Sequence, residues 1–172
     1  DEKDLLAICS KSSIEYKNYY FVHFLDKPTN LAIECIEKSV DLESDVLWII
    51  FANKHKNLSF LKNAIFVDGG PNDYVKLIRN ANNVFTDSFH SISFSILNHT
   101  NFIAFDRNYS HGISQSYRIT NVLKKFGYLD RYVASVKSFE NIHFSTKNIE
   151  NIKRNESIKQ IEYLKKAIGE CI

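Results

Sequence analysis

Short apolar runs alternate along this chain with segments of helical periodicity, and this alternation restricts the folds available to it. Tyr19 to Leu25, Val46 to Phe51 and Ala64 to Val67 are rich in aromatic and β-branched residues, which is typical of buried strands. Asn83 to Thr86 and Phe102 to Phe105 predict two more strands. Because the runs are apolar on both faces, they indicate a parallel sheet with helices on either side. The predicted fold class is therefore α/β, a three-layer Rossmann-like domain with a mainly parallel sheet.

Apolar residues at helical spacing predict the helices between these strands. The three clearest sets are Leu31, Cys35, Ile36 and Val40; Tyr74, Leu77, Ile78 and Ala81; and Ile119, Val122, Leu123 and Phe126. Gly127 follows the third set, where a left-handed helix cap belongs.

Two predictions concern the end of the chain. Residues 141–145 form a weak last strand, and 148–168 form a helix that packs its Ile158, Ile161 and Leu164 face inward.

A chain of 172 residues is long enough for one domain with its own core, and we expect a single domain over 1–172. Residues 1–18 are left open as a helix, a linker or a remnant of a preceding domain. Because the chain contains no Met, we expect a processed chain or an excised domain from which an N-terminal domain is missing.

Charge and cysteine content exclude several classes of protein. The net charge of +2 gives no basic surface for nucleic acid. We find no run as long as a transmembrane segment and no signal peptide. Three scattered cysteines without a CxxC motif indicate a reduced, cytoplasmic setting.

The polar residues that follow the predicted strands are the candidates for a binding site, because ligands of open parallel sheets bind beyond the carboxyl ends of the strands. The candidate ligand-binding residues are Lys54, Gly69, Gly70, Asp87, Ser88, Phe89, Ser91, Arg107 and Arg118, and the candidate catalytic residue is His90. A helix that starts near Ser91 would add free backbone N–H groups and the positive end of its dipole. Such a site suits a phosphate or a carboxylate better than a neutral ligand.

Structural roles remain open for the same residues. Asp87 or Ser88 can simply cap the helix, and His90 can be a structural histidine. We interpret His23 and His143 as structural, since each lies within a strand pattern. The neighbouring Asp87, Ser88 and His90 do not predict a hydrolase triad, because no GxSxG motif is present and triad members come from separate loops. No His or Cys pair has the spacing of metal ligands, so no metal site is predicted.

Three stretches resemble the polysaccharide pyruvyl transferase family. LIRNANNVFTDSFHSISFSILNHTNFIAF contains a turn similar to the family's AxxVxTDSFHG or DRxHG pattern. QSYRITNVLKKFGYLDRY resembles the family's SRIxxLLxxxGLxDR, and GPNDYVKLI resembles GPxEFLxLI. Together these stretches cover Gly70 to Tyr132 in matching order and spacing.

The resemblance implies a bacterial transferase that moves a pyruvyl group from phosphoenolpyruvate to a sugar of a cell-surface polysaccharide or its precursor, as a ketal. It implies one half of a GT-B-like fold, the half that holds most of the donor site, with no cofactor besides the donor substrate. The sugar acceptor would bind largely to the missing N-terminal domain, so the isolated domain is expected to be inactive. Through its acceptor the cytoplasmic enzyme could associate with the inner membrane face. The family's histidine corresponds to His90 and its helix-borne arginine to Arg118.

Two residues depart from the family pattern. Ser88 stands where many members carry an arginine that helps hold the donor, and Ser91 replaces the usual glycine. We therefore expect Asp87 to fix the turn, Ser88 and the following N–H groups to bind an anion, and His90 to protonate the donor. Two alternatives remain, which are a GT-B-type glycosyltransferase domain that uses a nucleotide sugar and a non-catalytic binding module of the same fold.

Overall fold

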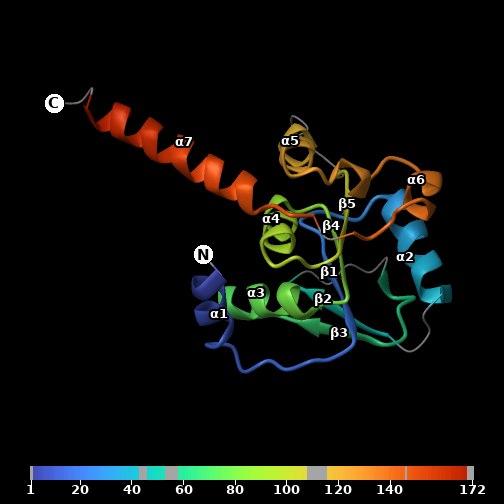
Figure 1. Ribbon diagram of the computed structural model, residues 1–172. Coiled ribbons are helices and arrows are strands. Elements are labelled where there is room, and N and C mark those ends of the chain that lie inside the picture. The colour runs from blue at the N-terminus through green and yellow to red at the C-terminus, as the bar shows by residue number, and fades with distance from the viewer. Residues whose placement is uncertain (1, 43–45, 53–57, 108–115, 146, 170–172) are drawn as a thin grey trace.

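Six short strands form one parallel sheet at the centre of the protein (Figure 1). The computed structural model describes residues 2–42, 46–52, 58–107, 116–145 and 147–169. The strands are β1 (Tyr19–His23), β2 (Leu47–Phe51), β3 (Ala64–Val67), β4 (Asn83–Thr86), β5 (Phe102–Phe105) and β6 (Tyr132–Val133). They are ordered β3-β2-β1-β4-β5-β6, with every neighbouring pair parallel. The strand order reverses between β1 and β4, and this is the point at which doubly wound sheets bind ligands.

Helices cover both faces of the sheet and complete the three predicted layers (Figure 1). One face carries α3 (Pro71–Asn80), α4 (Phe89–Leu97) and α5 (Ser116–Phe126), and the other carries α2 (Asn30–Leu42) and α6 (Val136–Glu140). α1 (Glu2–Cys9) lies against α3. Every residue of β1, β4 and β5 is buried, which explains why these strands read as continuous apolar runs rather than as alternating ones.

The strongest local signals in the sequence are found in the structure. β3, β4 and β5 have the predicted limits. Gly127 follows α5 with φ of +75°, a conformation that glycine adopts without steric cost. The N–H of Gly127 donates to the Lys124 carbonyl and the N–H of Tyr128 to the Leu123 carbonyl, so the helix ends in a Schellman motif. Residues 1–18, left open by the sequence, contain α1 and a segment whose Ser12 hydroxyl donates to Asp73 of α3.

The predicted last strand over 141–145 is wrong. The sixth strand is instead the two-residue β6, which pairs with β5, and the chain then forms α6. Ile142 is half-buried between exposed neighbours and packs on the core cluster beneath α2, but Phe144 is exposed, so the segment lacks the alternation of a strand and makes no ladder. A two-residue strand depends on its partner β5, and so it leaves almost no local pattern in the sequence.

The prediction that the last helix packs inward is also wrong. α7 (Glu150–Gly169) forms as expected but runs away from the body of the protein (Figure 1). Ile158, Ile161 and Leu164 are 46%, 52% and 55% exposed. Periodicity predicts that these side chains share a face, but it does not say whether anything lies against that face. Within the described part of the chain, no helix is long and apolar enough to cross a bilayer.

The position of α7 predicts a contrast between two isoleucines. Ile161→Ala should change the free energy of unfolding by no more than about 0.5 kcal/mol, because the side chain is already in water and alanine favours helix. Ile149→Ala, just before the helix, should cost about 2–5 kcal/mol, since Ile149 is fully buried in the core. Urea denaturation of both variants measures the difference. A comparable loss for Ile161→Ala would mean that the face is packed in solution.

Candidate functional site

The carboxyl ends of β1 and β4 meet at the reversal of strand order. His23 and Thr86, the last residues of the two strands, are paired in register, and the Thr86 hydroxyl donates to the His23 carbonyl at 2.6 Å. The same Thr86 oxygen accepts a hydrogen bond from the N–H of Ser88 at 2.9 Å. The chain therefore leaves β4 in a tight, hydrogen-bonded turn, and α4 begins within three residues of the strand.

Asp87 holds this turn to its two neighbouring loops. Its carboxylate is 1% exposed and accepts the N–H of Leu25 at 2.8 Å and the N–H of Asp26, both of which follow β1. On the other side, Arg107 after β5 brings its Nε to 3.5 Å from Asp87 Oδ2 and donates to the Asp87 carbonyl at 3.4 Å. Burial raises the pKa of the Asp87 carboxyl, and the Leu25 N–H and the Arg107 charge partly oppose this shift.

Ser88 is the N-cap of α4. Its hydroxyl oxygen accepts the N–H of Ser91, and its carbonyl accepts the N–H of Ile92 at 3.1 Å. The side chain is buried, so the structural role considered for Ser88 is present in the structure. Any further contact of the Ser88 hydroxyl with a ligand stays a prediction.

The first two residues of α4 form the outer layer of the turn. Phe89 is half-buried, and His90, the second residue of the helix, is exposed. Their N–H groups have no acceptor within the helix, as is general for a first helical turn. We find no other acceptor for them in the part of the chain that the structure describes. The turn therefore presents two unbonded N–H groups and an imidazole at the positive end of the α4 dipole.

Positive charge reaches this turn from two other elements. The guanidinium carbon of Arg118, in the first turn of α5, lies 4.9 Å from the centroid of the Phe89 ring. Arg107 lies on the opposite side, against Asp87. The structure thus brings seven of the predicted site residues together around the start of α4: Asp87, Ser88, Phe89, His90, Ser91, Arg107 and Arg118.

The other predicted ligand-binding residues are placed differently. Gly70 is the N-cap of α3, and its N–H donates to Asp73 Oδ2 at 2.9 Å. A Cβ on Gly69 would meet the Asp73 Cβ at 2.8 Å, so this glycine is required by the start of α3 itself. Lys54 lies outside the described residues.

Ser91 points into the protein and contacts two residues that sequence reasoning did not assign to the site. Its Oγ is 2.9 Å from His23 Nδ1 and 2.6 Å from the Tyr74 hydroxyl. His23 is buried, in keeping with its interpretation as a structural histidine, but it belongs to a polar network directly beneath α4. Their positions in the chain could have indicated that both residues lie near the site. His23 ends a strand and Tyr74 lies in the first turn of a helix, both at the carboxyl edge of the sheet.

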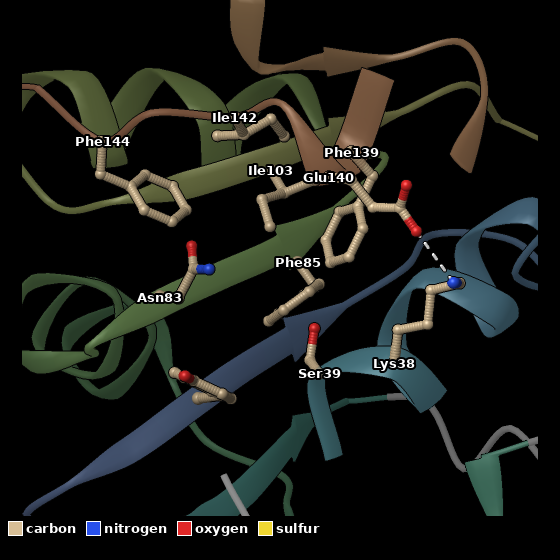
Figure 2. A pocket seen from close by; sticks show the side chains of 10 residues that line it. Lys38, Ser39, Asn83, Phe85, Ile103, Phe139, Glu140, Ile142 and Phe144 are labelled. Atoms are coloured by element: carbon tan, nitrogen blue, oxygen red, sulfur yellow. Dashed lines mark hydrogen bonds and ion pairs between the residues drawn. The ribbon is translucent and has the colours of Figure 1, made fainter. Parts of the chain in front are cut away.

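A separate pocket of about 570 Å³ lies at the other end of the sheet, on the α2 side (Figure 2). Its floor comes from the early residues of three strands, Tyr20, Asn83 and Ile103. Lys38 and Glu140 form an ion pair across its rim at 2.9 Å. The pocket is therefore distinct from the turn that carries His90.

Two substitutions of the buried Asp87 should affect the stability of the fold differently. Asp87→Asn keeps an oxygen acceptor, whereas Asp87→Ala leaves the N–H groups of Leu25 and Asp26 unpaired, at about 1–3 kcal/mol for each. The raised pKa means that the folded state holds the Asp87 proton more tightly than the unfolded chain does. The contribution of Asp87 to stability therefore falls as pH rises from its unfolded pKa through its folded pKa.

Asp87→Asn cannot ionise and escapes this loss. The unfolding free energy of Asp87→Asn minus that of the wild type should therefore increase between about pH 4 and about pH 7. Urea denaturation of both proteins at the two pH values measures it. A difference that decreases over this range would contradict the assigned direction of the pKa shift.

Comparisons with known proteins agree with this architecture. Residues 3–109 match the family model of polysaccharide pyruvyl transferases, and the match includes the turn from Asp87 to Ser91. Residues 116–132, which carry Arg118, lie beyond the match, so their resemblance to the family stays a prediction. No curated protein matches the chain.

A solved structure shares the fold. The UDP-GlcNAc 2-epimerase from Methanocaldococcus jannaschii is similar with a TM-score of 0.50 and 14% sequence identity, over 92% of this chain and 50% of that one. At this identity the likeness concerns the fold alone, and the chain spans half the length of that structure. The family match covers more than half of this chain and contains the turn on which the site is built, so the chain belongs to the polysaccharide pyruvyl transferase family.

Proposed function

We propose that this chain forms the donor-binding half of an enzyme that transfers a pyruvyl group from phosphoenolpyruvate to a sugar of a cell-surface polysaccharide or its precursor. The observation that carries the proposal is the first turn of α4, where unbonded N–H groups, the exposed His90 and the neighbouring Arg118 lie together. Membership of the polysaccharide pyruvyl transferase family supports pyruvyl transfer as the reaction class.

The donor would bind as an anion at the start of α4. Phosphoenolpyruvate carries a phosphate and a carboxylate, and both accept hydrogen bonds from backbone N–H groups. The N–H groups of Phe89 and His90 lie at the positive end of the helix dipole, which favours negative charge. Arg118 adds positive charge beside Phe89, and Arg107, which pairs with Asp87, adds a second guanidinium near the turn.

His90 would act as the general acid. Its imidazolium gives a proton to the methylene carbon of phosphoenolpyruvate, and positive charge develops at C2. A sugar hydroxyl attacks C2, and a second hydroxyl of the same sugar then displaces phosphate by breaking the C2–O bond. One hydroxyl proton restores His90 and the other leaves with phosphate, so the products are the pyruvate ketal and inorganic phosphate. A histidine suits this step because its unperturbed pKa lies near neutral pH.

The acceptor would be held by a second unit. The chain spans half the length of the structure that shares its fold, and a two-domain arrangement of that size would place the acceptor opposite α4. We further propose that the reaction takes place in the cytoplasm, at the inner membrane face where the acceptor is membrane-bound. Cys9 and Cys35 are buried free thiols, as expected of a reducing compartment.

Substitution of His90 tests the chemistry. In the full-length enzyme, His90→Ala should slow pyruvyl transfer by about 10²- to 10⁴-fold, the range typical of losing a general acid. The melting temperature should hardly change, because His90 is exposed. His143→Ala is the control, since His143 is also exposed but lies beside the pocket at the other end of the sheet. Full activity of His90→Ala, or an equal loss in His143→Ala, would remove His90 from the mechanism.

A panel of ligands tests the donor. Phosphoenolpyruvate should raise the melting temperature of the full-length protein more than equal concentrations of phosphate or of nucleotide sugars, because a ligand that binds only the folded state stabilises it. The shift should be smaller in Arg118→Gln. A larger shift with a nucleotide sugar would instead favour a glycosyltransferase. No shift with any of these ligands would favour a binding module.

A further inference from the structure

A buried polar network lies directly beneath the proposed donor site. The Tyr74 hydroxyl is 2.6 Å from Ser91 Oγ and 3.3 Å from His23 Nδ1, and Ser91 Oγ is 2.9 Å from the same nitrogen. The three side chains come from three different elements, which are the first turn of α3, the first turn of α4 and the last residue of β1. The network therefore joins the start of α4 to its two neighbours, α3 and β1.

We propose that Tyr74, Ser91 and His23 are positioning residues that hold the first turn of α4 in the orientation required to bind the donor anion. The inference rests on the proposed function, in which the N–H groups of Phe89 and His90 contact the donor. It adds that donor affinity depends on hydrogen bonds that do not touch the donor.

The hydrogen bonds of this network are hard to replace, because their surroundings are apolar. Aromatic rings surround the network, with the Phe51 ring 6.0 Å from His23 and 5.2 Å from Tyr74, and the Phe94 ring 6.1 Å from Tyr74. Inside such a cluster a hydroxyl that loses its partner has no water to replace it. Ser91 is fully buried, so it keeps its partners only in one rotation of α4.

The donors and acceptors of the network can be assigned from the three side chains themselves. Burial raises the pKa of the Tyr74 hydroxyl, although hydrogen bonds with Ser91 and Ser88 oppose the shift, so the hydroxyl keeps its proton at neutral pH. When His23 Nδ1 carries no proton, Tyr74 donates to Ser91 and Ser91 donates to His23. The Ser91 hydroxyl then both accepts a hydrogen bond and donates one.

Position along the helix links the network to the site. Ser91 follows Phe89 and His90 directly, and its own N–H is capped by Ser88. A small rotation of this turn would move the two unbonded N–H groups and the imidazole together. Asp87 fixes the chain just before the helix, and the network fixes it just inside the helix. The two anchors therefore fix the first turn of α4 from both sides.

The structure offers a control for each variant. Tyr74→Phe removes one hydroxyl, and Tyr19→Phe is its control, since the Tyr19 hydroxyl is also buried and donates to the Leu77 carbonyl of α3 at 2.7 Å, away from the site. Ser91→Ala is paired with Ser95→Ala, one helical turn further along α4. Ser95 is also fully buried, and its Oγ has no hydrogen-bond partner within the described residues.

The experiment measures donor binding and hydrogen exchange in the full-length protein. Tyr74→Phe and Ser91→Ala should each weaken the binding of phosphoenolpyruvate by roughly tenfold, the factor expected for one hydrogen bond. The double variant should lose no more than either single one, because both remove the same interaction. Tyr19→Phe and Ser95→Ala should bind as the wild type does. Lower melting temperatures with unchanged donor binding in the network variants would overturn the proposal.

Hydrogen exchange separates this proposal from the proposed function. The amides of Ser91 and Ile92 are bonded to Ser88, and they should exchange faster in Tyr74→Phe and Ser91→Ala than in the two controls. If the wild type fails to bind phosphoenolpyruvate, the proposed function is wrong, and the exchange rates alone decide whether the network positions α4. Equal exchange in network variants and controls would overturn the positioning role.

Discussion

The candidate site depends on the contacts that the Asp87 carboxylate makes with the neighbouring loops. Three neighbouring strands, β1, β4 and β5, end at this edge of the sheet. Asp87 joins all three, because it lies in the β4 loop, accepts N–H groups from the β1 loop and pairs with Arg107 of the β5 loop. A buried charge is costly to desolvate, and the backbone donors and the guanidinium offset only part of that cost, so the pKa of the Asp87 carboxyl stays raised. The start of α4 is therefore held in place before any ligand binds.

The polar group that the sequence presents as one motif divides into two layers in the structure. Asp87, Ser88 and Ser91 are buried and bond to the protein, whereas Phe89 and His90 face outward. The division follows from helix geometry, since consecutive residues of a first turn point in different directions. It also bears on Ser88, which stands where many family members carry arginine. In this chain the hydroxyl caps the helix, and positive charge reaches the turn from the β5 loop and from α5 instead.

Local sequence patterns were sufficient to predict the central strands and the end of α5. They were insufficient where the structure of an element depends on residues far away in the chain. β4 and the cap at Gly127 were predictable because burial on both faces and a left-handed turn each leave a signature within a few residues. β6 and the exposed face of α7 were not predictable, because pairing with β5 and the absence of packing are decided elsewhere in the chain. For the candidate site, the position of His90 beyond β4 could be predicted, but the network of His23 and Tyr74 required the distances between three elements.

Two arginines of the family-like segment 116–132 show why motif membership alone does not assign a role. Arg118 starts α5 at the carboxyl edge and lies over Phe89. Arg131 is buried at the opposite edge, with its guanidinium carbon 5.4 Å from the Phe102 centroid, 5.3 Å from that of Tyr128 and 4.6 Å from that of Phe144. It donates to the Ser145 carbonyl at 3.1 Å, and burial lowers its pKa. A cation enclosed by three rings stabilises the segment between α5 and β6 and cannot reach a ligand at α4. The edge of the sheet at which a residue lies, rather than the motif that contains it, decides whether it can reach the start of α4.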